Sequence, residues 1–382
     1  MRTLLITSDF PPIISGISTY LYNMWRLLPR DDHIVLAAKA EGYEHVDEKS
    51  GLTVIRYRDF RSRLVRIAVL LPRILALIPR ERIDILVCAV PLSMGFIGLV
   101  FKKILNMPYC VFYYGGELKK YRNKKYLARL MKLVLMNADL VIPISEFAQR
   151  EVISIGIKPE KTVTITPGLD TDRFSPRVDP SAVRKRFDLD DKKVILTVSR
   201  LVRRKGIDVV ISALPKILKD VPNAVYIIVG CGSEESSLKK SVREKALSKN
   251  IIFTGGISEE ELPEYYASCD LYVMPNRETD SDETFEGFGI SFIEASACGK
   301  PVIGGMSGGA AEAVEDGVTG LLVVPEDEDA VASAAIRILK DEAYASRLGR
   351  NGSDRIKREF TCLSRAAILE EVLRKVFFKD DK

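Results

Sequence analysis

Short apolar runs alternate with helical patterns along the whole chain, and this alternation limits the folds that it can adopt. The apolar runs predict strands, and amphipathic stretches such as 207–218 and 328–339 predict helices between them. Strands that alternate with helices form βαβ units, so the pattern indicates an α/β fold with parallel sheets. The predicted strands are 3–7, 34–37, 53–57, 83–89, 111–114, 140–144 and 163–166, then 194–199, 224–229, 251–254, 271–274, 301–303 and 320–324.

The predicted strands fall into two sets, and this grouping indicates two Rossmann-like domains. A chain of 382 residues is long enough for two compact domains. Its composition, with 47% hydrophobic and 29% charged residues, excludes a disordered chain. The break between the sets lies near 167–177, a stretch rich in turn-forming residues. The pattern at 361–378 predicts a last amphipathic helix, and its periodicity leaves open which domain it packs on.

Basic residues are concentrated in the first half of the chain. Residues 1–167 contain 25 Lys and Arg against 15 Asp and Glu, so this half favours an anionic partner. The segment 60–82 mixes Arg with Leu and Ile. It fits either a helix on an anionic membrane or a helix packed on the sheet with a solvated basic side, and Pro72 is expected to break it midway. No nucleic-acid partner is expected, because no pattern matches a nucleic-acid-binding module.

Other classes of protein are excluded by what the sequence lacks. No stretch reaches the roughly 20 apolar residues of a transmembrane helix, and the apolar run at 1–6 is too short for a signal peptide. The six cysteines form no Cys-x-x-Cys pair, so a zinc ribbon or a thioredoxin-like site is not expected. These features predict a cytoplasmic protein, peripheral on the membrane if the basic half docks there.

Two predicted loops carry groups suited to phosphate. Residues 8–20 run from a strand through Gly16 into a helix, whose first N–H groups attract anions. Residues 198–208 place Arg200 and Lys205 directly after a strand, at the edge where parallel sheets bind ligands. A guanidinium and an ammonium group there suit a diphosphate. The ordinary alternatives are a βα turn that needs one glycine and a solvated basic loop.

A third segment, 285–305, combines carboxylates with a glycine-rich turn. Glu286 precedes the turn, and Glu294 lies eight residues further on, inside the predicted helix 290–297. The start of this helix offers the free N–H groups of Phe288, Gly289 and Ile290. Two carboxylates near one helix N-terminus can bind hydroxyl groups of a single ligand. The ordinary alternative is one Glu on the helix dipole and one exposed loop Glu.

Taken together, these segments resemble the retaining glycosyltransferases of family 4, which have the GT-B fold, and most of all their phosphatidylinositol mannosyltransferase branch. The resemblance extends over nearly the whole chain and is densest between 194 and 325. Beside the N-terminal glycine loop, it is carried by SRLVRRKG at 199–206, GCGSEESSL at 230–238, EGFGISFIEA at 286–295 and GGAAEAVEDGVTGLLV at 308–323.

This resemblance implies two Rossmann-like domains facing across a cleft. Residues 1–168 would form the acceptor-side domain, joined by the C-terminal helix at 361–382, which crosses back to it. Residues 169–360 would form the domain that binds the nucleotide sugar.

The resemblance also implies a role for each residue that meets the donor nucleotide. Arg200 and Lys205 would hold the diphosphate, and Gly16 would close over it from the other domain. Glu294 would accept the ribose hydroxyls, and the backbone at Ile257 would contact the base. Ser15 stands where family members often have a second glycine, so one conformationally permissive position is lost.

The donor sugar and the acceptor side are assigned in the same way. Four groups would hold the sugar: the Glu286 carboxylate and the N–H groups of Phe288, Gly289 and Ile290. The family commonly has His-Gly-x-Glu or His-Gly-x-Asp facing this sugar, and this chain has Tyr-Gly-Gly-Glu at 114–117. Tyr114 is a poor base with a pKa near ~10, so it is expected to act by positioning. Glu117 would orient Tyr114 or bind the acceptor.

The chain has only two histidines, His33 and His45, and neither occupies that position of the motif. His33 follows two aspartates and is expected to be a surface residue in a loop.

These inferences predict a retaining glycosyltransferase. It would move a hexosyl group, with mannosyl favoured, from a GDP- or UDP-sugar to a hydroxyl of a glycan or lipid-linked acceptor. No metal or other cofactor is expected, because Arg200 and Lys205 supply the cations. The Asp280–Asp282 pair, one of four Asp-x-Asp pairs, is attributed to chance.

Two alternatives stay open. The first is a non-catalytic or partner-dependent relative, which the missing histidine suggests. The second is an NAD-dependent oxidoreductase, which the absence of Gly-x-Gly-x-x-Gly opposes.

Overall fold

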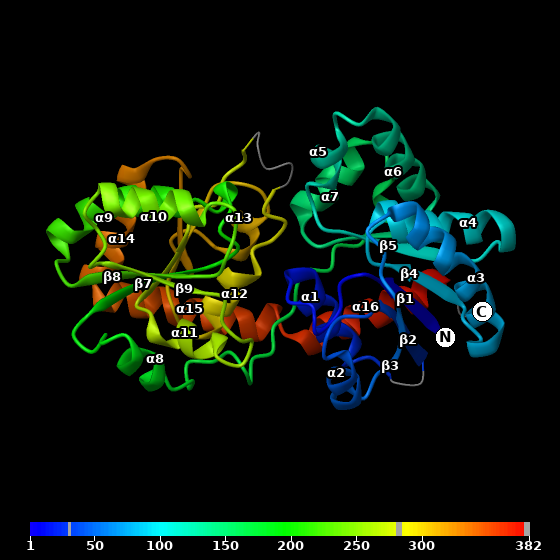
Figure 1. The fold of residues 1–382 in the computed structure, drawn as a ribbon, viewed down its shortest axis with the longest axis horizontal. Helices are drawn as coiled ribbons and strands as arrows, with labels where there is room; N and C mark the ends of the chain where they lie inside the picture. Colours follow the sequence, from blue (N-terminus) through cyan, green and yellow to red (C-terminus); the bar gives the residue numbers. More distant parts are fainter. Residues whose placement is uncertain (30–31, 280–284, 378–382) are drawn as a thin grey trace. The chain divides into compact units, whose positions relative to one another are not determined.

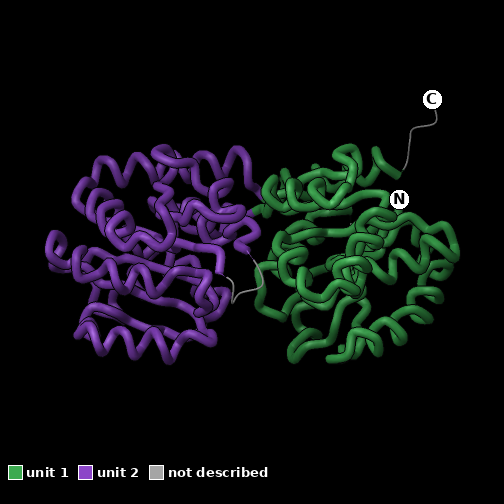
Figure 2. The backbone as a smooth tube through the Cα atoms, turned by 90° about the horizontal axis from the view of Figure 1, so that it is seen from above, with its two compact units in different colours: residues 1–168, 362–382 green, residues 169–361 purple. Residues whose placement is uncertain are grey.

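The computed structural model describes residues 1–29, 32–279 and 285–377, which form two compact units (Figure 1). Unit 1 comprises Met1–Gly168 and Cys362–Lys382, and unit 2 comprises Leu169–Thr361, as coloured in Figure 2. The chain therefore passes between the units twice. Within the described ranges, no helix combines the length and the apolar character that a membrane crossing requires.

Unit 1 is built on a parallel six-stranded sheet with the strand order β3-β2-β1-β4-β5-β6. Its strands are β1 Thr3–Thr7, β2 His33–Ala38, β3 Thr53–Tyr57, β4 Ile85–Cys88, β5 Tyr109–Tyr113 and β6 Leu140–Pro143. Its α-helices are α1 Gly16–Trp25, α2 Tyr43–Ser50, α3 Arg63–Glu81, α4 Phe96–Leu105, α5 Glu117–Tyr121, α6 Lys125–Asn137, α7 Glu146–Ser154 and α16 Cys362–Phe377. The central strands are buried throughout, as expected for a parallel sheet covered by helices.

Unit 2 repeats this topology with the strand order β12-β11-β10-β7-β8-β9, also parallel. Its strands are β7 Lys193–Val198, β8 Ala224–Val229, β9 Ile251–Gly255, β10 Leu271–Met274, β11 Val302–Gly305 and β12 Gly320–Val323. Its α-helices are α8 Ser181–Arg186, α9 Ile207–Asp220, α10 Glu235–Glu244, α11 Leu262–Ser268, α12 Ile290–Ala297, α13 Ala310–Ala313, α14 Glu328–Lys340 and α15 Glu342–Glu359. Both sheets thus have the strand order of the Rossmann fold, which confirms the predicted fold class.

The strand order reverses at one point in each sheet, and this point determines where a ligand can bind. In unit 2 the reversal lies between β7 and β10, and in unit 1 between β1 and β4. Parallel sheets bind ligands outside the carboxyl ends of the strands at this point. The loop with Arg200 and Lys205 follows β7, and Gly16 follows β1, so these predicted residues lie at the two switch points.

One predicted strand is wrong. Segment 163–166 is extended and lies beside β6, but it does not join the sheet as a strand. Ile165 donates its N–H to the Pro143 carbonyl at 2.9 Å. Its own carbonyl accepts the Tyr20 hydroxyl at 2.6 Å instead of extending a ladder.

The expected break at Pro72 is also wrong, because α3 runs without interruption from Arg63 to Glu81. Pro72 removes one backbone donor, and its ring crowds the carbonyl of Ala68. Both residues are exposed, so water can satisfy this carbonyl. The opposite side of the helix packs on the core through Ile67, Leu70, Ile74 and Leu77.

The last helix belongs to unit 1, as the resemblance implied. In Figure 1, α16 lies beside α1, and the two helices are in contact. It buries one side of its amphipathic pattern, namely Cys362, Ala366, Leu369 and Leu373.

His33 is not the surface loop residue that the sequence predicted. It is the first residue of β2 and is 1% exposed. Its Nδ1 lies 2.7 Å from Thr3 Oγ1, and its Nε2 has no hydrogen-bond partner among the described residues. Burial lowers the pKa of His33 from 6.5 to about 4, although Asp32 opposes this shift. The preceding aspartates misled the prediction, because β2 begins directly after them.

His33 predicts a loss of stability in acid. The unfolded chain takes up this proton near pH 6.5 and the folded chain only near pH 4. The contribution of neutral His33 to the free energy of unfolding is therefore complete above pH 6.5. It falls as the pH drops and is smaller by about 2 kcal/mol at pH 5. Replacing the imidazole with an amide removes the titration, so urea unfolding of His33→Asn should depend less on pH between 7 and 5.

The second histidine provides the control. His45 is exposed, so His45→Asn should unfold with the pH dependence of the wild type. An equal flattening in both variants would contradict the assignment to His33.

Candidate functional site

The loop after β7 places two predicted cations at the carboxyl edge of the unit 2 sheet. Arg200 is exposed, whereas Lys205, at the end of the 3₁₀ turn Arg203–Lys205, is buried. Gly206 then caps α9 with a φ of +70°. A Cβ atom at this position would lie 2.2 Å from the Pro275 carbonyl oxygen after β10. Only glycine therefore allows the loop after β7 and the loop after β10 to approach each other this closely.

Glu286 joins this loop through a buried ion cluster. Its Oε2 accepts hydrogen bonds from Lys205 Nζ at 2.5 Å and from Arg204 Nη1 at 3.0 Å. Burial raises the pKa of Glu286, but Lys205 and Arg204 outweigh it and hold the pKa below its ordinary value. Burial lowers the pKa of Lys205, Glu286 opposes this, and Arg204 and Arg200 add to the lowering. The structure thus brings the predicted Lys205 and Glu286 into contact, whereas Arg200 is linked to them only through its effect on the pKa of Lys205.

The turn after Glu286 leads into α12 with its first N–H groups unused by the helix. Gly289 caps the helix with a φ of +89°, and its carbonyl accepts the Phe292 N–H at 3.0 Å. The predicted N–H groups of Phe288, Gly289 and Ile290, together with that of Ser291, precede this first helical bond. The Phe288 ring anchors the turn, because it is buried with its centroid 5.6 Å from that of Phe360.

Glu294 lies on α12 in an apolar setting. It is 7% exposed, and its Oε2 accepts the Tyr266 hydroxyl at 2.6 Å. Burial raises the pKa of Glu294 from 4.5 to about 7, although the bond from Tyr266 opposes this. Burial raises the pKa of Tyr272 well above its ordinary value, and the two predicted carboxylates, Glu294 and Glu286, add to this. Near neutral pH, Glu294 can accept or donate hydrogen bonds to a hydroxylated ligand.

Ile257 lies in the loop that follows β9 and is partly buried. The loop is tied to residue 173, because Arg173 Nη2 forms an ion pair with Glu259 Oε2 at 2.9 Å. Glu259 raises and Arg173 lowers the pKa of Glu294.

In unit 1, the loop after β1 ends at the N-terminus of α1. Gly16 is the first residue of that helix, and Ser15 caps it by accepting the Ser18 N–H at 3.0 Å. Ser15 has a φ of −157°, which any residue can adopt. Its position therefore does not require the glycine that is common in the family, and the expected loss of a permissive position has no structural cost.

Tyr114 and Glu117, which follow β5, are half-buried residues with buried polar atoms. The Tyr114 ring lies beside Phe112 and edge-on to Tyr20, with centroids 6.4 and 6.2 Å away. Its hydroxyl is buried without a hydrogen-bond partner among the described residues. Burial raises the pKa of Tyr114 well above its ordinary value, and Tyr20, Glu117 and Asp9 add to this. The phenol therefore stays protonated and can donate to a ligand.

Glu117 acts on the backbone of Tyr114 rather than on its phenol. Its Oε1 accepts the Tyr114 N–H at 2.9 Å, and its Oε2 is buried with no hydrogen-bond partner in the described ranges. Burial raises the pKa of Glu117 from 4.5 to about 7, and the bond from Tyr114 limits this shift.

Sequence reasoning missed two residues of the site. Arg204, one of two neighbouring arginines, is the second cation on Glu286, and Tyr266 is the hydroxyl partner of Glu294. The RRK run marks Arg204 only as one of several cations. Nothing in the local sequence marks Tyr266, because α11 and α12 meet only in the fold.

The expected absence of a metal site remains a prediction. Asp280 and Asp282 lie outside the described residues. Within the part of the chain that the structure describes, no three His, Cys, Asp or Glu side chains are grouped to hold a metal ion.

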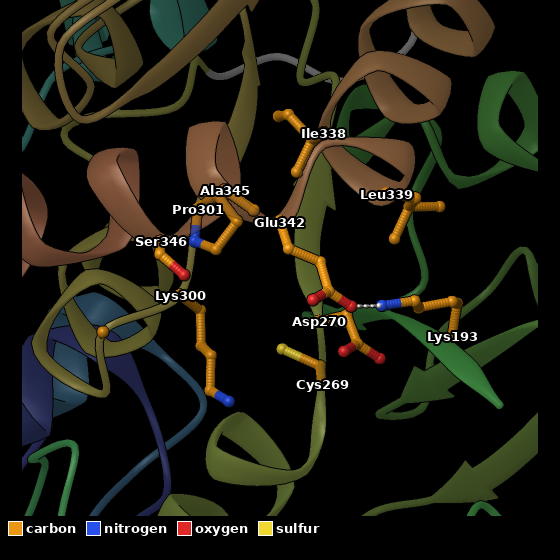
Figure 3. Close-up of a pocket in the computed structure, with 11 residues that line it drawn as sticks. Lys193, Cys269, Asp270, Lys300, Pro301, Ile338, Leu339, Glu342, Ala345 and Ser346 are labelled. Atoms are coloured by element: carbon orange, nitrogen blue, oxygen red, sulfur yellow. Dashed lines mark hydrogen bonds and ion pairs between the residues drawn. The ribbon is translucent and has the colours of Figure 1, made fainter. Parts of the chain in front are cut away.

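A cavity of about 240 Å³ in unit 2 lies away from these residues (Figure 3). Lys193 and Glu342 form an ion pair at 3.0 Å across it, and Asp270 and Pro301 also line it. Lys193 begins β7, and the other two directly precede β10 and β11. The cavity is therefore at the amino edge of the sheet, opposite the edge where parallel sheets bind ligands.

Comparison with protein families covers most of the chain. The family described as Glycosyltransferase Family 4 matches residues 14–173, and that described as Glycosyl transferases group 1 matches residues 181–355. Each match falls largely within one unit.

Two curated relatives are similar over nearly their whole length. One is the GDP-mannose-dependent alpha-(1-6)-phosphatidylinositol monomannoside mannosyltransferase of Mycolicibacterium smegmatis, 32% identical over 97% of both chains. Another is the GDP-mannose-dependent monoacylated alpha-(1-6)-phosphatidylinositol monomannoside mannosyltransferase of Corynebacterium glutamicum, 29% identical over 94% of both chains.

Solved structures agree in fold. Anabaena Alr3699/HepE, solved with UDP and glucose, superposes with a TM-score of 0.83 at 22% identity, covering 98% of this chain and 99% of that one. Sucrose-phosphate synthase of Thermosynechococcus elongatus gives a TM-score of 0.84 at 25% identity, with the same coverage.

The Tyr114 hydroxyl has no hydrogen-bond partner among the described residues. We therefore expect Tyr114→Phe not to destabilise the protein. A buried hydroxyl without a partner costs free energy, so its removal should leave the free energy of unfolding unchanged or raise it. Tyr20 is the matched control, because its hydroxyl donates to the Ile165 carbonyl at 2.6 Å. Tyr20→Phe should lose ~0.5–1.5 kcal/mol in urea unfolding. A larger loss in Tyr114→Phe than in Tyr20→Phe would mean that the Tyr114 hydroxyl has a structural role.

Proposed function

The chain belongs to glycosyltransferase family 4, and on this premise we propose that it transfers a mannosyl group from GDP-mannose to a hydroxyl of a lipid-linked acceptor. The observation that carries the proposal is the buried cluster of Lys205, Arg204 and Glu286 at the unit 2 switch point. The Mycolicibacterium and Corynebacterium relatives support GDP-mannose as the donor and a mannosylated phosphatidylinositol as the acceptor.

In this proposal, unit 2 holds the donor. Arg200 is exposed and near Lys205, so the two can bind the diphosphate as a fork and a point charge. Glu294, with its pKa of about 7, meets the ribose hydroxyls. Glu286 and the first N–H groups of α12 bind the hydroxyls of the sugar.

The chemistry then depends mainly on electrostatics. As the bond between sugar and phosphate breaks, the sugar becomes oxocarbenium-like and negative charge grows on the leaving diphosphate. Arg200, Lys205 and the N-terminus of α12 stabilise that charge. The departing phosphate can take the acceptor proton on the same side of the ring, which gives retention. Tyr114, which stays protonated, donates a hydrogen bond and does not act as the base.

Unit 1 carries a surface suited to an anionic membrane, which we call the α3–α4–α6 surface. These three helices connect β3 to β6 in order and contact one another in sequence, so they cover the same side of the sheet. The surface is defined by exposed apolar side chains, namely Leu64, Val65, Val69, Leu75, Ile104, Leu105, Tyr126, Leu133 and Met136.

Basic side chains lie among these apolar ones. Lys103 is exposed on α4, and Lys125, Arg129 and Lys132 are exposed on α6. An apolar surface with cations around it can bury its side chains among lipid tails and pair its charges with anionic headgroups. This arrangement would bring the enzyme to a lipid-linked acceptor. The sequence left open whether segment 60–82 is a helix on a membrane or a helix packed on the sheet. In this proposal α3 does both, because one side packs on the core and the other exposes apolar side chains.

The donor proposal is tested by turnover with a panel of GDP- and UDP-sugars. Wild-type protein with mannosylated phosphatidylinositol should use GDP-mannose, and EDTA should not stop the reaction, because Lys205 and Arg200 replace a divalent ion. Lys205→Ala and Arg200→Ala should each lower kcat/KM by on the order of 10²-fold or more.

Each part can fail separately. Unchanged kcat/KM in both variants would remove the diphosphate role, and rescue of an EDTA-inactivated enzyme by Mn²⁺ would restore a metal. Donor binding without turnover would favour a partner-dependent relative, and tight binding of NADH alone would favour an oxidoreductase.

The membrane proposal predicts cosedimentation with vesicles that contain anionic lipid. Binding should rise with the anionic fraction and fall at high salt, because each cation near the surface contributes ~1 kcal/mol that salt screens. Leu64 and Val69 are 78% and 39% exposed, so Leu64→Glu with Val69→Glu should weaken binding without unfolding the protein.

An exposed leucine elsewhere in unit 1 serves as the control. Leu363 on α16 is 68% exposed, and α16 packs on α1 rather than on α3, α4 or α6. Leu363→Glu should bind vesicles as the wild type does. If the protein bound neutral and anionic vesicles equally, or bound neither, the basic side chains of the α3–α4–α6 surface would not serve membrane binding.

A further inference from the structure

Two neighbouring cations bind the same atom of Glu286 in this structure. Lys205 Nζ lies 2.5 Å from Oε2 and Arg204 Nη1 lies 3.0 Å from the same oxygen. Arg204 and Lys205 are each only 9% exposed, whereas Arg203 in the same 3₁₀ turn is exposed. The turn thus directs one arginine of the pair inward, and the proposed function does not say what this arginine does when the donor binds.

Arg204 is held in place independently of Lys205. Its carbonyl accepts the backbone N–H of Arg277 at 2.8 Å, and Arg277 in turn pairs with Asp208 at 2.7 Å. Arg277 follows β10 and Asp208 lies in the first turn of α9. The Arg204 backbone, which follows β7, is therefore also tied to the loop after β10.

The proposed function requires Lys205 to serve two anions. In this structure Lys205 is paired with Glu286, but a bound donor would place its diphosphate near the same ammonium group. If Lys205 turns toward the phosphate, Glu286 loses one of the two cations that keep it ionised. A buried carboxylate that loses its cation takes up a proton or moves.

We propose that Arg204 is a positioning residue that holds Glu286 ionised and oriented toward the donor sugar while Lys205 binds the diphosphate. This inference rests on the proposed function. Arg204 acts through Glu286 and does not touch the phosphate, so it determines how tightly the sugar is held and not how tightly the nucleoside diphosphate is held. A guanidinium suits this task, because its fixed fork holds a carboxylate at a defined angle.

The test compares Arg204→Met with Arg203→Met, its exposed neighbour. Calorimetry should give Arg204→Met a GDP affinity within about threefold of the wild type, because GDP lacks the sugar. Its affinity for GDP-mannose and its kcat/KM should fall roughly 10- to 100-fold. Since Glu286 then ionises less readily, the acid limb of the pH–rate profile should move to higher pH. Arg203→Met should match the wild type in all four measurements.

Two further variants keep the test decisive. Arg204→Lys retains the charge without the fork, so it should restore the pH profile and only part of the sugar affinity. If Arg204→Met does not fold, Arg204→Lys carries the comparison alone. In a Glu286→Gln background, the change at Arg204 should have no further effect on sugar affinity, because the two residues act as one unit.

Three results would overturn the inference. Equal losses of GDP and GDP-mannose affinity would show that Arg204 itself binds the diphosphate. Unchanged kinetics would show that Lys205 alone suffices for Glu286, and an unmoved pH profile with lower activity would leave only a structural role. Failure of the proposed function is distinguishable, because the wild-type protein would then show no turnover of GDP-mannose before any variant is compared.

Discussion

The ionised state of one buried carboxylate governs the arrangement of the unit 2 site. The burial of Glu286 raises its pKa, and the contacts of Lys205 and Arg204 outweigh this and keep the pKa below its ordinary value. These cations can reach it because Gly206 lets the loop after β7 approach Pro275 after β10. The backbone packing at the switch point thus places the charges, and the charges in turn hold the turn that begins α12.

The two units use the same strand order for different chemistry. At the switch point of unit 2, the side chains are charged and paired. In unit 1, Tyr114 and Glu117 are polar groups whose burial favours the neutral form, with pKa values raised above the ordinary ones. Fixed charge suits a diphosphate, and neutral donors and acceptors suit hydroxyl groups. The proposed function uses this division by placing the donor on unit 2 and the acceptor side on unit 1.

The sequence predicted most of the fold, and its errors have identifiable physical causes. Strand 163–166 was a wrong prediction because the Ile165 carbonyl bonds to Tyr20. Pro72 did not end α3 because it lies on the exposed side of a helix that packs well on its other side. His33 was placed on the surface from its acidic neighbours, but β2 carries it into the core. In each case a contact from a distant segment outweighed the local signal.

The sequence by itself determined the alternation of strands and helices, the two domains, and the candidates Arg200, Lys205, Glu286 and Glu294. It could do so because strand periodicity, glycine turns and the position of charges after strands are properties of neighbouring residues. Only the tertiary structure decided that Arg204 and not Arg203 meets Glu286, and that Tyr266 holds Glu294. Those choices depend on the direction of a 3₁₀ turn and on the packing of α11 against α12, which bring together side chains 28 to 82 positions apart.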